Sequence, residues 1–296
     1  MELIRASRTL ILPEMQGYRR TLGVVLSGGA AHCVVHIGCL RVLEREGIPV
    51  KAIAAASAGS IVGAAFAAGV AMEQMARIVR DLRWKDLFRI APSRMGLLSS
   101  APLERLLDSL LPVKRLEDLK IPLLAVATDL GTGKATVISR GEIVPAVRAS
   151  CALPGLLPPS IRSDRLLVDG GVSANVPTQV LRRRGVDIIM VSDANQGLTR
   201  FARPTNLFEV IVQSIYITTR KAVTPYIEAA DLIVAPEIGQ IGWQDLSRAD
   251  EMLRAGEAAM ERKLAELRAL MMERRVIRRM VGKLARGQAR RSSNDR

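Results

Sequence analysis

The sequence predicts a three-layer α/β/α fold with a mostly parallel central sheet, and two observations lead to this prediction. Short apolar segments alternate with helical patterns along most of the 296 residues, and strands separated by helices favour a parallel sheet covered on both faces. Apolar residues make up 49% of the chain but aromatic residues only 3%, so the core must consist mainly of Ala, Val, Ile and Leu. Such small side chains favour close packing of helices on a sheet.

Seven short apolar runs bounded by turn residues are predicted to be strands. They are residues 21–26, 52–56, 123–128, 134–139, 166–168, 187–192 and 232–234. Seven further segments carry apolar residues at helical spacing, and glycines at 47 and 69 end the first two of them. They are residues 31–46, 58–68, 72–82, 103–111, 142–149, 207–226 and a last helix from 246 past 267.

No linker or repeat divides the chain, so we expect one α/β domain over residues 21–270. An N-terminal extension (1–20) precedes it and a basic C-terminal tail (271–296) follows it. Residues 83–98 show neither periodicity, and we expect an irregular segment there that is a candidate flap over the site.

The composition argues against a secreted or membrane-spanning protein. We expect no signal peptide, because a basic and then apolar region is missing at the start. The most apolar stretch, 52–72, is interrupted by serines and glycines, which favours strand, turn and buried helix over a membrane span. Cys33, Cys39 and Cys151 are odd in number and lack metal-binding spacing, so we expect packed, reduced thiols, no metal site and a cytoplasmic location.

The net charge of +14 is compatible with nucleic acid, with an anionic membrane or with no specific partner, and half of the excess lies in the last 24 residues. There, nine Arg or Lys residues face two acidic ones, and apolar residues recur at helical spacing. The tail is either a basic amphipathic helix for an anionic membrane surface, making the protein peripheral at the membrane, or a frayed end. A nucleic-acid partner is not expected, because no aromatic residue accompanies these charges.

The strongest chemical signal is AASAG at residues 55–59, where a serine between small residues joins a predicted strand to a predicted helix. This pattern is typical of a nucleophile elbow, whose sharp turn leaves no room for larger side chains. Ser57 also lies at a helix N-terminus, where the free amide of Ala58 can stabilise an oxyanion. The alternative is an ordinary helix with a serine N-cap.

A carboxylate is the expected base, because no histidine follows the serine. His32 and His36 both precede it, which excludes the Ser, Asp, His order of α/β-hydrolases, and we expect His36 to pack under the glycine loop. Asp169 ends an apolar strand and is followed by Gly170 and Gly171, which allow close backbone approach. A dry pocket would raise its pKa toward the working pH. The alternative is a plain turn.

The loop from Ser27 to Ala30 lies between the first predicted strand and helix. It matches neither a dinucleotide fingerprint nor a phosphate-binding Walker loop. The backbone amides of Gly28, Gly29 and Ala30 can receive an anion, so we predict an oxyanion hole built from them and from Ala58.

Four stretches resemble the patatin-like phospholipase family. They are LSGGAAHCVVHIGCL at 26–40, AASAGS at 55–60, VRASCALPG at 147–155 and VDGGVSANVP at 168–177. A fifth, ADLIVAP at 230–236, is similar to the bacterial and neuropathy-target-esterase-like branch. The resemblance covers about residues 21–264. It implies a patatin fold, a Ser–Asp dyad without histidine, and esterase or lysophospholipase activity independent of metals and cofactors.

By position, the resemblance assigns the nucleophile to Ser57, the base to Asp169 and the oxyanion loop to residues 27–30, with Gly59, Gly170 and Gly171 as supporting motif residues. Three departures from the family pattern are Ala55 for a glycine, His32 and Cys33 for a basic residue and a glycine, and Ser27 for a glycine. A neutral His32 supplies less positive potential than an arginine.

The expected reaction is hydrolysis of lipid acyl esters through an acyl-enzyme, of the phospholipase or lysophospholipase A type. Two alternatives stay open. One is a catalytically degenerate protein that binds lipid or a protein partner. The other is a transacylase, which passes the acyl group to another alcohol.

Overall fold

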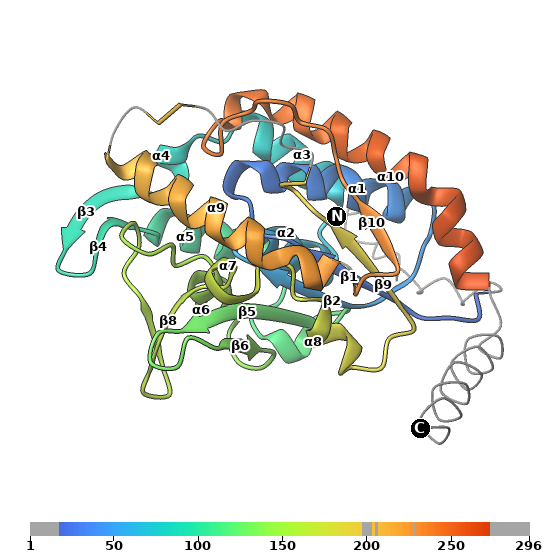
Figure 1. The fold of residues 1–296 in the computed structure, drawn as a ribbon, viewed down its shortest axis with the longest axis horizontal. Coiled ribbons are helices and arrows are strands. Elements are labelled where there is room, and N and C mark those ends of the chain that lie inside the picture. The colour runs from blue at the N-terminus through green and yellow to red at the C-terminus, as the bar shows by residue number, and fades with distance from the viewer. Residues whose placement is uncertain (1–17, 197–202, 205–206, 228, 273–296) are drawn as a thin grey trace, which may run out of the picture.

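The computed structural model describes residues 18–196, 203–204, 207–227 and 229–272, and Figure 1 shows a sheet enclosed by helices. The strands are β1 (Leu22–Leu26), β2 (Val50–Ala56), β3 (Arg89–Ser93), β4 (Gly96–Ser99), β5 (Leu123–Asp129), β6 (Ala135–Ile138), β7 (Ser160–Arg162), β8 (Arg165–Asp169), β9 (Ile188–Ser192) and β10 (Leu232–Val234). The helices are α1 (Val34–Arg45), α2 (Ala58–Ala68), α3 (Met72–Asp81), α4 (Trp84–Leu87), α5 (Ala101–Leu110), α6 (Ile143–Ser150), α7 (Gly171–Ala174), α8 (Thr178–Arg182), α9 (Leu207–Ile227) and α10 (Ala249–Met272), with short 3₁₀ turns at Ala30–Cys33, Leu116–Asp118 and Leu246–Arg248.

The main sheet has the strand order β10, β9, β1, β2, β5, β8, β7, and β6 also pairs with β5. The strands from β10 to β5 are parallel to their neighbours, whereas β6, β7 and β8 pair in antiparallel fashion. The predicted three-layer fold with a mostly parallel sheet is therefore confirmed. The parallel arrangement brings the carboxyl ends of β1, β2 and β9 to one edge of the sheet.

Successive residues of a strand point to opposite faces of the sheet, and here both faces are covered by apolar clusters. Val24 and Leu26 of β1 join a large apolar cluster with α1, α2 and α10, whereas Val25 between them joins a smaller cluster with Leu181 of α8. Every residue of β1 is buried.

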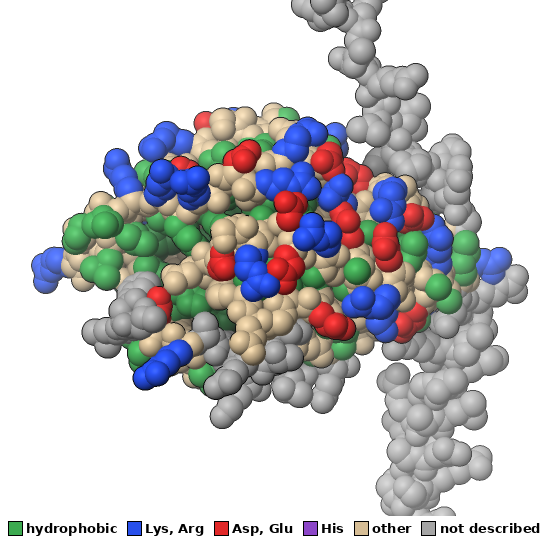
Figure 2. All heavy atoms as spheres, turned by 90° about the horizontal axis from the view of Figure 1, so that it is seen from above, with side chains coloured by type: hydrophobic (Ala, Val, Ile, Leu, Met, Phe, Trp, Pro, Cys, Tyr) green, Lys and Arg blue, Asp and Glu red, His purple; other side chains and the backbone are tan. Residues whose placement is uncertain are grey.

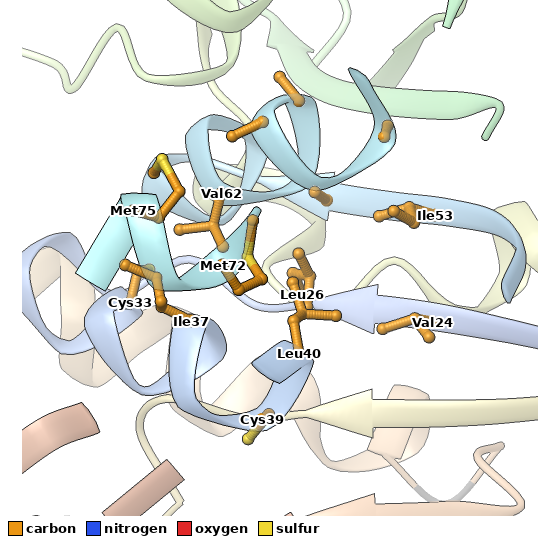
Figure 3. Close-up of a cluster of buried hydrophobic side chains, with 14 of the residues drawn as sticks. Val24, Leu26, Cys33, Ile37, Cys39, Leu40, Ile53, Val62, Met72 and Met75 are labelled. Carbon is orange, nitrogen blue, oxygen red and sulfur yellow. The ribbon is translucent and has the colours of Figure 1, made fainter. Parts of the chain in front are cut away.

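The larger cluster packs aliphatic and methionine side chains from four elements against one another. Figure 3 shows Leu26 of β1 beside Ile37 and Leu40 of α1, near Val62 of α2 and Met72 of α3. None of these five side chains is more than 5% exposed. The core thus consists of the small apolar residues that the composition predicts.

The expectation of an irregular segment at residues 83–98 was wrong. This region contains α4 followed by the antiparallel hairpin β3–β4, which forms a second, two-stranded sheet. Asp86 stabilises the start of α4, because the backbone N–H of Arg83 donates to its carboxylate at 2.9 Å and its own N–H donates to the Arg83 carbonyl at 2.9 Å. The segments are too short for a periodic pattern, and Pro92 within β3 masks the strand.

The two predicted terminal segments fall mainly outside the described residues, which exclude 1–17 and 273–296. The predicted α/β domain was expected to end at 270, and α10 extends to Met272. Among the helices that the structure describes, none combines the length and the apolar composition that a membrane span needs.

Candidate active site

Ser57 lies in a strained turn between β2 and α2. Its backbone has φ 51° and ψ −138°, a conformation that residues other than glycine rarely adopt. The backbone N–H of Ser57 donates to Ser150 Oγ at 3.0 Å, and Ser150 Oγ donates in turn to the Val126 carbonyl at 2.6 Å. These bonds fix the turn to the sheet. The sharp strand-to-helix turn predicted from the AASAG run is present, and Ala55 is buried within β2.

Asp169 lies next to Ser57 although 112 positions separate them in the chain. The sheet register explains the meeting: Ala56 of β2 pairs with Val126, and Asp169 of β8 pairs with the next residue, Ala127, from the other side of β5. Ser57 Oγ donates to Asp169 Oδ2 at 2.5 Å, and the backbone N–H of Gly171 donates to Oδ1 at 2.7 Å. Each carboxylate oxygen therefore has its own donor.

Burial raises the pKa of Asp169 to about 6 from the usual 3.8. Asp169 is only 3% exposed, and removal from water disfavours its ionised form. The hydrogen bonds from Ser57 and Gly171 favour the carboxylate and oppose this effect. At pH 7 the group is therefore mostly ionised yet far more basic than an ordinary aspartate, as required of a general base.

The predicted oxyanion loop lies directly beside Ser57. A Cβ on Gly28 would come within 2.4 Å of Asn175 Oδ1 and 2.9 Å of Ser57 Cβ, so only glycine fits there. The sequence predicted that Gly28 donates to an oxyanion. In the structure its N–H donates instead to the Asn175 carbonyl at 3.3 Å. Within the described residues, the amides of Gly29, Ala30 and Ala58 have no acceptor, and these remain the candidate donors.

Two asparagines that the sequence analysis did not single out contact the backbone of the 27–30 loop. Asn195 Nδ2 donates to the Gly28 carbonyl at 2.5 Å, and Asn175 Nδ2 lies 3.4 Å from the same oxygen. Because a trans peptide is planar, this directs the N–H of Gly29 away from Asn195. The feature of the sequence that could have identified Asn195 is its position just after β9. The carboxyl end of β9 lies at the same edge of the sheet as that of β1.

Both histidines are buried and neither contacts the Ser57 hydroxyl. His36 lies under the glycine loop as predicted, with Nε2 donating to the Ser27 carbonyl at 2.9 Å and Nδ1 accepting from Ser192 Oγ. Burial lowers its pKa to about 4. His32 bonds through Nε2 to the Ile241 carbonyl at 2.8 Å, and burial lowers its pKa as well. Both imidazoles are therefore neutral at pH 7.

The three cysteines are free and buried. Burial raises the pKa of Cys39 to about 12 and shifts those of Cys33 and Cys151 in the same direction, so all three are protonated thiols at neutral pH. In the described part of the chain, no three His, Cys, Asp or Glu side chains are grouped so as to hold a metal ion.

Ser57 and Asp169 line an apolar cavity of about 480 Å³. Ala30 and Ala58 line it as well, and most of the remaining lining consists of aliphatic and aromatic side chains, among them residues of α2, α3, α4 and α5. A pocket of this kind accommodates a long apolar group whose polar end reaches the serine.

The patatin-like phospholipase family model matches residues 24–182. An uncharacterized NTE family protein of Mycobacterium tuberculosis is 30% identical over 189 residues, which are 62% of this chain and 52% of that protein. Lysophospholipase NTE1 of Cryptococcus neoformans is 34% identical over 178 residues, 58% of this chain and 11% of that protein. The chain thus spans about half the length of the first curated relatives that it matches.

Among solved structures, VipD from Legionella pneumophila has a similar fold, with a TM-score of 0.53 at 14% identity over 83% of this chain and 67% of VipD. A similarity at this identity concerns the fold alone. The family match, by contrast, covers more than half of the sequence and includes both the elbow and the Asp-Gly-Gly turn. The chain therefore belongs to the patatin-like phospholipase family.

Proposed function

We propose that the protein hydrolyses acyl esters of lipids, as a phospholipase or lysophospholipase of the A type, with Ser57 as nucleophile and Asp169 as base. The observation that carries the proposal is the 2.5 Å hydrogen bond from Ser57 Oγ to Asp169 Oδ2 at the wall of an apolar cavity. Such a pair needs no histidine, because the raised pKa of Asp169 lets the carboxylate accept the serine proton.

The reaction runs in two steps. Asp169 takes the hydroxyl proton while Ser57 Oγ attacks the ester carbonyl, and the amides of Gly29, Ala30 and Ala58 stabilise the negative oxygen. The protonated Asp169 then gives its proton to the departing alcohol, which leaves an acyl group on Ser57. In the second step Asp169 takes a proton from water as the water attacks the acyl-enzyme, and it returns this proton to Ser57 Oγ as the bond to the acyl group breaks and the fatty acid leaves.

The lipid substrate is supported by family membership and by the apolar lining of the cavity. A fatty acyl chain suits this apolar lining, because burying its methylene groups there is favourable. Residues 273–296, for which a membrane-binding role is predicted, lie outside the described part. A cytoplasmic location, peripheral at a membrane, stays a prediction.

The test is incubation of the protein with phosphatidylcholine and with lysophosphatidylcholine, followed by mass spectrometry of the released products. We expect fatty acid from at least one substrate with the wild type and none with Ser57→Ala. Transfer of the acyl group to added glycerol, in place of release, would identify a transacylase. A folded wild type without any product would favour the catalytically degenerate alternative.

A further inference from the structure

The β3–β4 hairpin exposes large apolar side chains for which the core provides no reason. Ile90 is 83% exposed, Met95 53% and Leu97 49%. Ile90 pairs with Leu98, so Leu97 lies on the opposite face of the hairpin and Met95 lies in the turn between the strands. An antiparallel sheet is normally polar on its solvent side, and grouped exposed apolar residues mark a binding surface.

The hairpin is anchored along β4, beginning next to its turn. The backbone N–H groups of Leu97 and Leu98 both donate to the Leu156 carbonyl, at 2.9 and 2.8 Å. Gly96 packs directly on the backbone of Pro158, and Ser93 Oγ donates to the Gly96 carbonyl at 3.0 Å across the turn. A two-stranded sheet is marginal in water by itself, so these contacts hold the apolar side chains in their exposed positions.

This surface adjoins the cavity that contains the predicted dyad. Ile90 and Leu98 line that cavity together with Ser57 and Asp169. Trp84 and Phe88, from α4 and the residue after it, stack at 5.3 Å between ring centroids and line it too. Apolar surface therefore continues from the hairpin to Ser57. An acyl chain that leaves a lipid layer at the hairpin would stay in contact with apolar side chains until it reaches the serine.

The charge around the hairpin is basic. Arg83, Lys85, Arg89 and Arg94 are exposed, and Asp86 is the one acidic residue between positions 83 and 99. Among the described residues, no carboxylate forms an ion pair with any of these four cations. Figure 2 shows hydrophobic side chains gathered at the left end, where Figure 1 places β3 and β4, with a basic side chain at the outer edge.

We propose that the β3–β4 hairpin is a membrane-contact element, which inserts Met95, Leu97 and Ile90 into the surface of an anionic lipid layer and so seats the cavity mouth on the substrate. The apolar side chains enter the acyl boundary while the arginines and Lys85 contact anionic headgroups. A second copy of the chain is a poorer occupant, because two hairpins meeting face to face would bring Arg89 and Arg94 of each copy together. The proposal rests on the proposed function only for the delivery of substrate.

The test places a fluorescent probe at the turn. The full chain with Ser57→Ala and Met95→Cys is labelled with an environment-sensitive dye; the three native cysteines are buried, so the introduced thiol reacts selectively. We expect a blue shift of the dye on adding vesicles of phosphatidylglycerol and phosphatidylcholine, and a smaller one with phosphatidylcholine alone or at high salt. The matched control is Leu130→Cys, at another exposed position that is 51% exposed and outside the cavity lining, whose dye should not respond.

A second variant separates insertion from catalysis. Met95→Ser/Leu97→Ser should weaken vesicle binding about tenfold or more, yet leave hydrolysis of a short water-dispersed ester unchanged. Vesicle-bound protein with no shift at position 95, or no vesicle binding, would overturn the proposal. A blue shift of the dye that depends on protein concentration and not on vesicles would overturn the proposal and would identify a second copy of the chain as the occupant. Because the Ser57→Ala background excludes turnover, a failed hydrolase assay and a failed insertion assay remain separate results.

Discussion

The two oxygens of the Asp169 carboxylate have different partners, and this division determines what the residue can do. Oδ1 accepts from the backbone N–H of Gly171, which fixes the orientation of the group, and Oδ2 is left for the Ser57 hydroxyl. Backbone contacts hold the residue as well, since Thr128 Oγ1 donates to the Asp169 carbonyl at 2.8 Å. The proton can therefore move between two groups that are already in place, which lowers the cost of ordering them during the reaction.

The raised pKa of Asp169 predicts an acid limb in the pH profile. The base works in its ionised form, so kcat/KM should fall as the pH drops through about 6, the pKa that burial gives the residue. An ordinary aspartate, with a pKa of 3.8, would keep the activity down to about pH 4. Steady-state assays on a water-dispersed ester from pH 4.5 to 9 check this, with circular dichroism as a control for folding. A flat profile down to pH 4.5 would exclude Asp169 as the base.

Asn195 is predicted to position the oxyanion loop through its bond to the Gly28 carbonyl. Asn195→Leu removes this bond, and a loop amide displaced from the developing charge should lower kcat about ten- to a hundredfold with little change in KM. The matched control is Gln196→Ala, at the adjacent exposed residue, which should leave both constants unchanged. An Asn195→Leu variant of normal kcat would show that the loop needs no such support, and a rise in KM alone would indicate a role in substrate binding.

At the scale of elements, the long helix α10 lies along α1 and closes one side of the molecule (Figure 1). The two helices approach closely at Gly38, where an added Cβ would lie 2.2 Å from the Leu253 carbonyl oxygen and 2.8 Å from the Glu257 nitrogen. Both contacts are backbone atoms, which cannot turn aside as a side chain does. Since only the 3₁₀ turn Ala30–Cys33 separates α1 from the predicted oxyanion loop, this packing also holds that loop in place.

Gly38→Ala should therefore destabilise the fold. The methyl group forces the helices apart, and overpacking of this kind costs about 1–3 kcal/mol or more in free energy of unfolding. Urea denaturation followed by circular dichroism measures the change. Gly242→Ala is the control, because its nearest neighbour, Asp245 Cβ, is 3.9 Å away and the change should stay within about 0.5 kcal/mol. Equal stability of the two variants would contradict this description of the α1–α10 contact.

For the whole molecule, the sequence predicted elements that are long or strongly apolar and missed those defined by tertiary pairing. α2 and β10 have the predicted bounds, because an apolar run between glycines or turn residues determines both. β7, α7 and α8 were missed, since each has five residues or fewer and depends on its neighbours. The antiparallel course of β8, which brings Asp169 to Ser57, has no local signal at all.

The residues of the candidate site could be singled out from the sequence to the extent that they lie at the ends of strands. Ser57 follows the last residue of β2 and Asp169 is the last residue of β8, each beside small residues, a context that marks them in the sequence. Asn195 also follows a strand, β9, but its role requires knowing that β9 lies next to β1. The engagement of the Gly28 amide by Asn175 likewise depends on a contact 147 positions apart.

Labelling with a fluorophosphonate probe tests the central claim, that Ser57 is activated by Asp169, most directly. The wild type, Ser57→Ala and Asp169→Asn are compared at pH 7.5, with thermal unfolding to establish that each is folded. We expect rapid labelling of the wild type, none of Ser57→Ala, and labelling at least about a hundredfold slower for Asp169→Asn, because its amide cannot accept the serine proton. Labelling that persists in Ser57→Ala, or proceeds equally fast in Asp169→Asn, would contradict the account.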